Sequence, residues 1–539
     1  MADSHSESYE ELITPLKNEL KKILMNSKSV KKGPTTKFIL NTTVVTEEEL
    51  LRKERLGEKN DDKPHKVILM VGETGTGKTA LINAMINYIM GVRWEHKIWL
   101  EVVGVSENQT RSQTAAVTVY EVFPQDSPFS LTVIDTPGFG DAENEDKDKS
   151  IPEALQQLFR SEDGIHEIHA VCVVLKVSET RLHERQQYIL DEIMSLFGKD
   201  IEKHILLVFT HQLHKTLPQK VFNFIKESKI KCAKTKKPNE YICFMFDNCQ
   251  SDYYSEEDRE SYKASWDRGI ENFKRFFDYL NGINPKSLDM TEGVLRARKQ
   301  LDASVNNLKD RIVFADCRKQ ELEQTKAALE ECEQGREKEN NFVYEIDEAY
   351  KQEVQINSSW WHLSKQATRC TDCKENCHYP GCWWVKDLSW CSVMTDGKCT
   401  VCTGKCDHTK HVKDDKMYEI QTRKVKRTKE DLKKKYEKEL GENKSVFIGL
   451  ENEIRWLEAE KIRLVEECYQ CLEKLMETAL KSTSMSCFLY LDFMIEKVKE
   501  TGKEERVQKL EDLKRRSQEE NKGLIIRFNR YCKTKINNK

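Results

Sequence analysis

Apolar residues gather into short, continuous runs in the stretch between residues 64 and 285. Such runs are expected of strands that are buried on both faces of a parallel sheet. Segments of helical length separate most of them, at residues 80–90, 182–197 and 218–227. Because this alternation requires crossover connections, it predicts an α/β domain with a mainly parallel, doubly wound sheet. The predicted strands are residues 66–71, 116–123, 131–134, 169–177, 204–210 and 241–246.

The segments before and after this domain have a different pattern of apolar and polar residues. Residues 1–63 are polar and charged, with leucines at helical spacing up to Leu24, and we expect a helix followed by a linker. Beyond residue 285 the pattern is almost wholly helical. Leucine or alanine recurs every seven residues from Leu301 to Leu329, but lysines occupy part of the partner seam. This favours a long helix over a specific dimeric coiled coil.

A block rich in cysteine interrupts the helical half. We therefore expect a helical arm at 286–358, a Cys/His-rich module at 359–412 and a helical C-terminal region at 413–539. Two helical arms around a compact insert suggest an antiparallel coiled-coil-like hairpin with the insert at its tip.

Composition narrows the class of protein. Of 539 residues, 33% are charged and 38% are hydrophobic, which suits long exposed helices beside a smaller core. The net charge of −3 gives no basic field for nucleic acid, and the basic runs at 231–237 and 424–438 are interpreted as a solvated loop and a helix face. No stretch reaches the roughly 18 apolar residues of a membrane span. We expect a cytoplasmic protein without a transmembrane anchor or nucleic-acid partner.

The first chemical motif follows the first predicted strand. Glycines let a loop turn tightly and direct successive backbone N–H groups at phosphate oxygens, and the next helix adds its positive end. Lys78 is expected to reach the β- and γ-phosphates, and the Thr79 hydroxyl to ligate Mg²⁺. The predicted phosphate loop is Gly72, Glu73, Thr74, Gly75, Thr76, Gly77, Lys78 and Thr79.

A second motif ends the strand at residues 131–134. Asp135 is placed to approach the metal, usually through water, and Gly138 can offer its N–H to a γ-phosphate. Between the two motifs, either Thr114 or Thr118 could supply a further hydroxyl ligand to Mg²⁺. We favour Thr114 because it precedes its strand, and the alternative of an ordinary strand threonine stays open for each.

From residue 66 to about 248 the chain resembles the GTPase of immunity-associated protein family, relatives of septins and chloroplast-import GTPases. Besides the two motifs, the resemblance rests on His169-Ala170-Val171-Cys172-Val173-Val174-Leu175, Arg181, Glu184, Leu196-Phe197-Gly198 and Phe209-Thr210. It implies a P-loop GTPase-type fold, GTP/GDP as ligand, a nucleotide-dependent homodimer and a link to immunity. It stops at the helical half.

The chain departs from that family where the base is read. Members carry a carboxylate-containing motif after this strand, whereas this chain reads Thr210-His211-Gln212-Leu213. Leu213 cannot accept the two hydrogen bonds of guanine. His211 can still stack on the base, and Asp247 and Asn248 resemble the last base-contacting loop. GTP is favoured over ATP, and ATP remains the alternative.

Hydrolysis is expected to be slow. Phe139 follows Gly138 where many small GTPases place a water-orienting glutamine, and no catalytic residue is evident. The hypothesis is a switch whose nucleotide-dependent dimerisation moves a helical arm toward a protein partner. A scaffold with a structural nucleotide is the alternative from another class.

The cysteine-rich block contains the half-repeat Cys-x-x-Cys-x-x-x-Cys twice. Thiolates spaced in this way suit tetrahedral Zn²⁺, and eight cysteines with three histidines suffice for two closed sites. Disulfides and loose thiols are the alternatives, and the partition of the ligands stays open. The candidate ligands are Cys370, Cys373, Cys377, His378, Cys382, Cys391, Cys399, Cys402, Cys406, His408 and His411.

Overall fold

The computed structural model divides the chain into two compact units. One consists of Met1–Leu295, Thr478–Ser484 and Gln518–Lys539, and the other of Arg296–Glu477 and Met485–Ser517. The structure describes residues 16–31, 34–102, 116–140, 146–178, 184–211, 218–237, 240–249, 254–333, 343–356, 366–428, 430–431, 446–482 and 485–520.

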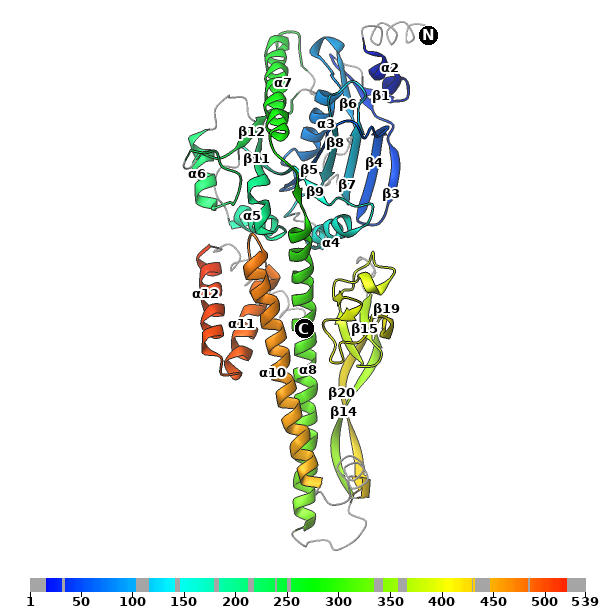
Figure 1. Cartoon of the computed structure of the whole chain (residues 1–539), viewed down its shortest axis with the longest axis vertical. Coiled ribbons are helices and arrows are strands. Elements are labelled where there is room, and N and C mark those ends of the chain that lie inside the picture. Colours follow the sequence, from blue (N-terminus) through cyan, green and yellow to red (C-terminus); the bar gives the residue numbers. More distant parts are fainter. Residues whose placement is uncertain are drawn as a thin grey trace. The chain divides into compact units, whose positions relative to one another are not determined.

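A large sheet organises the first unit (Figure 1). In the described part of the chain it has eight strands in the order β12-β11-β10-β5-β8-β7-β4-β3. All neighbours are parallel except the pairs β7–β8 and β3–β4. The prediction of a mainly parallel sheet is confirmed, with all six expected strands in it. The strands are β3 (Thr43–Glu47), β4 (Leu51–Gly57), β5 (His65–Gly72), β7 (Val117–Phe123), β8 (Ser130–Asp135), β10 (Ala170–Lys176), β11 (Ile205–Thr210) and β12 (Cys243–Phe246).

The interpretation of residues 1–63 as a helix and linker is wrong beyond residue 25. Helix α2 (Asn18–Met25) forms as expected and buries Leu20 and Leu24, but β3 and β4 join the large sheet. Only Leu51, Glu54 and Leu56 of β4 are buried, and the charged residues between the two leucines hide the strand pattern. A separate three-stranded sheet adds β1 (Lys28–Lys31), β2 (Thr36–Ile39) and β6 (Ile98–Glu101).

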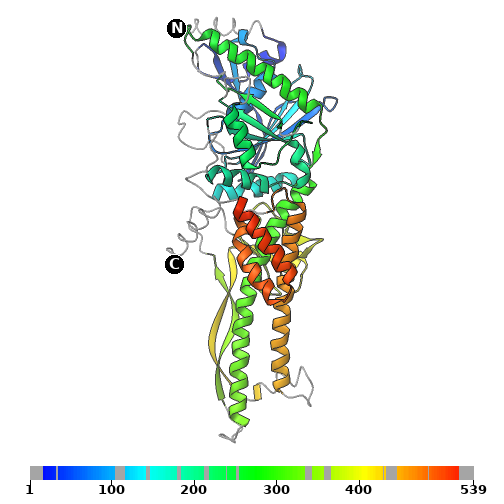
Figure 2. The ribbon, with the colours of Figure 1, turned by 90° about the vertical axis from the view of Figure 1, so that its left-hand side faces the viewer.

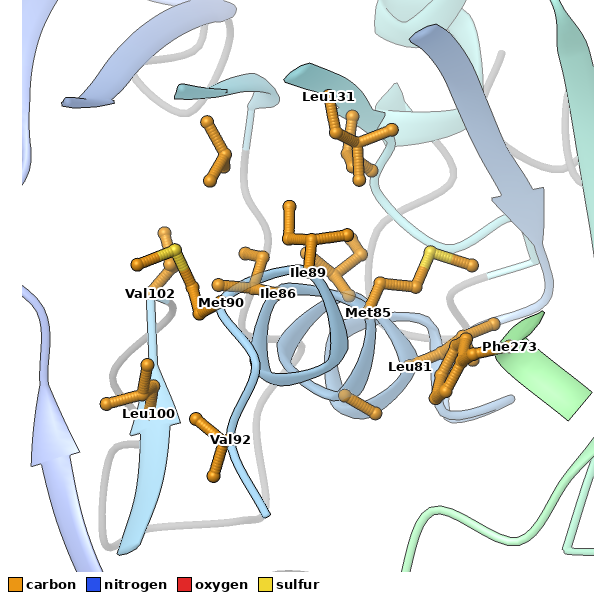
Figure 3. Packing of buried hydrophobic residues seen from close by; sticks show 14 of the residues in the cluster. Leu81, Met85, Ile86, Ile89, Met90, Val92, Leu100, Val102, Leu131 and Phe273 are labelled. Carbon is orange, nitrogen blue, oxygen red and sulfur yellow. The ribbon is translucent and has the colours of Figure 1, made fainter. Parts of the chain in front are cut away.

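Helix α3 (Lys78–Ile89) is the centre of the main core. Figure 3 shows Leu81, Met85, Ile86 and Ile89 pointing from it toward surrounding apolar side chains. The buried Asn87 on α3 also bonds to β6: its Nδ2 donates to Leu100 O (2.7 Å) and its Oδ1 accepts from Leu100 N (2.9 Å). The other elements of this unit are η1 (Trp94–His96), α4 (Asp146–Arg160), β9 (Glu167–Ile168), α5 (Glu184–Ser195), η2 (Lys199–His204), α6 (Gln219–Ser228), α7 (Arg259–Asn281) and β13 (Lys286–Ser287).

The second unit is built on a pair of long helices, α8 (Asp289–Glu333) and α10 (Val446–Thr478). Leu322 and Leu329 of α8 pack with Leu450 of α10. Arg318 binds Glu453 across the pair, with 2.5 Å between Nη2 and Oε1. The predicted long helices are therefore present. The shorter helices α11 (Met485–Glu500) and α12 (Glu504–Glu520) follow.

Two segments that were predicted to be helical form a ribbon instead. Strand β14 (Val343–Gln355) pairs antiparallel with β20 (Lys416–Thr428) along their whole lengths, as Figure 2 shows. The alternation at Tyr344 and Ile346, which are buried between exposed neighbours, is that of a strand with one covered face. The basic run from residue 424 thus begins on a strand, and the positions from 432 to 438 lie outside the described residues.

The cysteine-rich insert also differs from the prediction, because it is joined to the ribbon and packs beside α8 rather than at the tip of a helical hairpin. Asn307 Nδ2 donates to Asn376 O (3.3 Å), and the ribbon bonds to α8 through Ala349 N and Glu321 Oε2 (3.2 Å). Its elements are β15 (Ala367–Cys370), β16 (Glu375–His378), η3 (Leu388–Trp390), β17 (Met394–Thr395), β18 (Lys398–Cys399), η4 (His408–Lys410) and β19 (His411–Asp414).

Among the helices in the described ranges, none is both long enough and apolar enough to cross a bilayer.

Candidate functional site

The phosphate loop connects β5 to α3 as predicted. Gly77 caps the helix with φ +86°, and Gly75 has φ +80°, backbone conformations that glycine adopts without a steric penalty. Gly72 is needed for a different reason, since a Cβ atom there would lie 2.5 Å from Val174 O. This backbone can direct its N–H groups, together with the positive end of α3, at an anion.

Lys78 is the first residue of α3 and is buried. Its Nζ donates to Gly72 O and Glu73 O, both at 3.1 Å. Burial lowers the pKa of Lys78 to about 8, and the carboxylates of Asp135 and Glu73 oppose that shift. The ammonium group is therefore held inside the loop by carbonyl oxygens that a phosphate oxygen can replace.

The loop after β8 is bonded directly to the phosphate loop. Phe139 N donates to Gly72 O (3.1 Å), and Thr74 N donates to Phe139 O (3.2 Å). Thr74 Oγ1 also donates to Gly138 O (3.1 Å). A Cβ atom on Gly138 would lie 2.4 Å from Thr74 Cα, so only glycine fits. Asp135, fully buried, ends the strand immediately before this contact.

Arg185, at the start of α5, was not predicted to belong to the site. Its Nη2 donates to Gly140 O (2.7 Å) and lies 3.0 Å from Glu73 Oε1. It therefore ties the phosphate loop to the loop after β8. The sequence carries no local signal for this role, because an arginine among charged residues at a helix start is ordinary.

Three of the expected base-reading residues meet at Gly77. Thr210 Oγ1 donates to Thr76 O (2.6 Å), and His211 Nδ1 lies 3.2 Å from Thr210 Oγ1. Asn248 Nδ2 donates to Gly77 O (3.4 Å). Thr210 thus supports the loop backbone, while His211 and Asn248 flank it.

Asp247 is engaged elsewhere. Its Oδ2 accepts from Ser265 Oγ on α7 (2.6 Å) and from Cys249 Sγ (3.1 Å). This carboxylate anchors the loop after β12 to α7.

The remaining nucleotide residues divide into two groups. Thr79 is the second residue of α3, and Thr118 stands within β7 directly opposite Asp135 in the strand register. Thr114, the favoured switch threonine, lies outside the described residues, as do Gln212 and Leu213.

The cysteine-rich module brings ten of the eleven candidate ligands together. Among the residues that the structure describes, three groups have their ligand atoms within 4.8 Å of one another. They are Cys370, Cys373, Cys402 and Cys406; Cys377, Cys399, Cys402 and His411; and His378, Cys382 and Cys391.

His408 belongs to none of these groups, contrary to the expectation. Its Nδ1 lies 3.3 Å from Gly397 O and 3.3 Å from Asp407 Oδ1. It sits on the short helix η4, which turns the ring toward the β17–β18 hairpin.

Residues 66–261 match the model of the AIG1 family. They form an AIG1 family domain. Immune-associated nucleotide-binding protein 9 of Arabidopsis thaliana is 28% identical over 155 residues, which are 28% of this chain and 38% of that protein. Protein 3 of the same series is 32% identical over 149 residues (28% and 39%). GTP-binding protein A of Dictyostelium discoideum is 24% identical over 160 residues (30% and 31%).

The match therefore spans about two fifths or less of the length of these relatives, and the helical half lies outside the family model. Among solved structures, Toc33 from Arabidopsis thaliana in complex with Mg²⁺ and GMPPNP aligns with 39% of this chain and 86% of its own. Its sequence identity is 19% and its TM-score 0.25. The AIG1 domain contains every phosphate-loop residue described above.

Proposed function

We propose that this chain is a guanine-nucleotide-binding switch with slow intrinsic hydrolysis. The observation that carries the proposal is the hydrogen-bonded contact between the phosphate loop and the loop after Asp135. A γ-phosphate placed between these loops would be sensed by both of them. The N–H groups of residues 75–78 and Lys78 would hold the phosphates. Thr79 and Asp135, with Thr114, would hold Mg²⁺, which neutralises phosphate charge when bound.

GTP or GDP is the proposed ligand rather than ATP. The Dictyostelium relative is named as GTP-binding, and His211 and Asn248 flank Gly77, where a base would follow the phosphates. ATP stays the alternative because of Leu213. Displacement of a fluorescent GTP analogue by GTP, GDP and ATP distinguishes the two. We expect GTP and GDP to displace the analogue at lower concentration than ATP; equal displacement by ATP would support the ATP alternative.

Slow hydrolysis follows from the residue after Gly138. Phe139 is 1% exposed, and its backbone N–H and C=O are both bonded to the phosphate loop. An apolar ring in that position cannot orient an attacking water. We therefore expect single-turnover rates in the range of unstimulated switch GTPases.

Helix α5 is the proposed route from the nucleotide to the C-terminal region. Arg185, near its start, contacts both nucleotide loops. Asp191, six residues later, forms a buried ion pair with Lys481, which lies between α10 and α11. In the same segment Leu480 N donates to Phe197 O (2.8 Å), and Lys231 Nζ donates to Leu480 O (2.6 Å). A shift of α5 would thus be transmitted to residues 479–481.

Hydrogen exchange tests the coupling. In the full chain, the Leu480 amide is expected to exchange at least about threefold differently in the GTP-analogue and GDP states. Lys481→Met should remove this difference and keep nucleotide affinity, because residue 481 is not in the site. Lys509→Met, an exposed lysine of α12, is the matched control. Equal exchange in both states would refute the coupling, and a nucleotide that never dissociates would favour the scaffold alternative.

Two further parts of the proposal concern partners and metal. The nucleotide-dependent homodimer and a protein partner bound by the helical arm rest on the family resemblance and on the exposed charged helices. Light scattering of the chain with GTP analogue and with GDP tests the dimer. Zn²⁺ is the ion proposed for the cysteine-rich module, because its thiols and imidazoles meet in groups rather than in pairs.

A further inference from the structure

The three ligand groups of the cysteine-rich module imply more than the two closed sites that the sequence suggested. We infer that the module binds three zinc ions, two of which share the thiolate of Cys402. The inference rests on the proposed zinc binding and adds the number of ions, the ligands of each and the bridge between two of them.

The first site consists of four cysteines. Cys373 Sγ and Cys406 Sγ are 3.5 Å apart, close to the ~3.8 Å edge of a tetrahedron with Zn–S bonds of about 2.3 Å. Backbone N–H groups point at its sulfurs, from Cys373 to Cys370 Sγ (3.4 Å) and from Gly404 to Cys373 Sγ (3.3 Å). Such donors favour the thiolate form that binds metal. A Cβ atom on Gly404 would lie 2.9 Å from Cys406 Sγ, so glycine is needed there.

The second site combines three cysteines with one histidine. His411 Nδ1 donates to Asp407 O (2.9 Å), which leaves Nε2 as the nitrogen with a lone pair. That Nε2 is buried and has no hydrogen-bond partner among the described residues. Two backbone N–H groups, those of Val401 and Cys402, point at Cys399 Sγ (3.3 and 3.4 Å). An imidazole fixed in this way beside thiol groups has the second-shell arrangement of a zinc ligand.

Cys402 belongs to both groups, and this decides the stoichiometry. With Cys402 shared, each of the two ions has four protein ligands, the number that structural zinc takes. Without sharing, one of the two ions would keep only three. The sulfur also accepts from Cys406 N (3.3 Å), which helps to hold it as a thiolate between two cations. The two ions and their shared thiolate would thereby link the two halves of the module, residues 370–382 and 399–411.

The third site has three buried protein ligands. His378 Nδ1 lies 3.3 Å from Cys391 Sγ and 3.7 Å from Cys382 Sγ, distances that fit the edges of a zinc tetrahedron. Ser392 Oγ lies 3.1 Å from Cys382 Sγ. We assign the fourth position to this hydroxyl or to a water molecule.

Disulfides explain these contacts less well. The 3.5 Å between Cys373 Sγ and Cys406 Sγ is far from the ~2.05 Å of a bond. Disulfides would also leave His411 Nε2 without a role.

Native mass spectrometry of the full chain gives the number of ions directly. We expect three zinc ions per chain, unchanged in His408→Ala and reduced to two in Cys382→Ser, with retained binding of a fluorescent GTP analogue as the folding control. After exchange into an NMR-active cadmium isotope, the unaltered chain should give three signals, two of them with mutual metal–metal coupling. Cys402→Ser should abolish that coupling.

The outcomes separate this inference from the zinc proposal. Two ions per chain would overturn the third site, and three signals without coupling would overturn the shared thiolate, while both leave zinc in the module. A chain that carries less than about one ion would refute the zinc proposal itself. The wild-type measurements decide each point even if a variant fails to fold.

Discussion

Thr210 offers a sharp test of how the phosphate loop is held. Its hydroxyl donates to Thr76 O at 2.6 Å, and both side chains are almost completely buried. Thr210→Val keeps the shape but leaves the Thr76 carbonyl without this donor. An unsatisfied buried acceptor costs about 1–3 kcal/mol. Part of this lowers the stability of the empty domain and part weakens binding. Because 1.4 kcal/mol is a factor of ten, we expect about tenfold weaker nucleotide binding.

Titration of the full chain with a fluorescent GTP analogue measures this loss, and thermal unfolding measures the accompanying stability. Thr210→Ser is the matched control, since it keeps the hydroxyl and removes only a methyl group. We expect its Kd to stay within about threefold of the wild type. Unchanged affinity and Tm in Thr210→Val would refute the role of the hydrogen bond. Equal losses in both variants would assign the effect to the methyl group instead.

Three further predictions concern pH, stability and base selection. Burial lowers the pKa of His169 to about 4, against 6.5 unfolded. On acidification His169 therefore becomes protonated in the unfolded chain before it does in the folded chain. The free energy of unfolding should fall by up to about 3 kcal/mol as the pH drops from 6.5 to 4. His169→Gln should flatten this dependence in denaturant unfolding at several pH values; parallel curves would contradict the assignment. Asn87→Leu removes both bonds to the Leu100 backbone and should lower the unfolding free energy by about 2–4 kcal/mol, whereas exposed Asn60→Ala should not. An unchanged unfolding midpoint for Asn87→Leu would exclude that role. Leu213→Asp should raise the preference for GTP over ATP at least about tenfold. It should raise the preference for ITP over ATP by less, because ITP lacks the exocyclic amine. No change in competition binding would place base recognition elsewhere.

The sequence predicted the apolar strands of the large sheet and missed the strands rich in charged residues. The run at 67–71 is continuously apolar, as expected of β5 at the centre of the sheet. Strand β4, near the edge, has four consecutive charged residues between Leu51 and Leu56, and its composition is as common in exposed helices. The charged strands β14 and β20 were missed for the same reason. Their pairing partners lie more than sixty residues apart, so no local pattern reveals them.

The candidate site was predictable where chemistry is local in sequence. The phosphate loop and Asp135 are read from contiguous motifs whose spacing carries the function. The roles of Thr210 and Asp247 depend on which backbone or side chain each meets, and those partners come from distant segments. Arg185 was missed on the same ground. Ten of the eleven candidate metal ligands lie in the three groups and His408 does not, because ligand type is visible in the sequence while grouping requires the fold.

The register of the ribbon has a consequence for how this chain can be taken apart. Val343 is paired with Thr428 at one end of the ribbon, so the first and last residues of the ribbon are one strand spacing apart, about 5 Å. The chain thus enters the ribbon after α8 and leaves it before α10 at neighbouring positions. Residues 343–428 are thus an insertion whose two ends lie side by side. A short glycine–serine bridge can replace them without stretching the helices, whose own packing of Leu322 on Leu450 is untouched. In topological terms the cysteine-rich insert is a cassette, and its removal would expose the face of α8 that carries Ala303, Asn307 and Glu321.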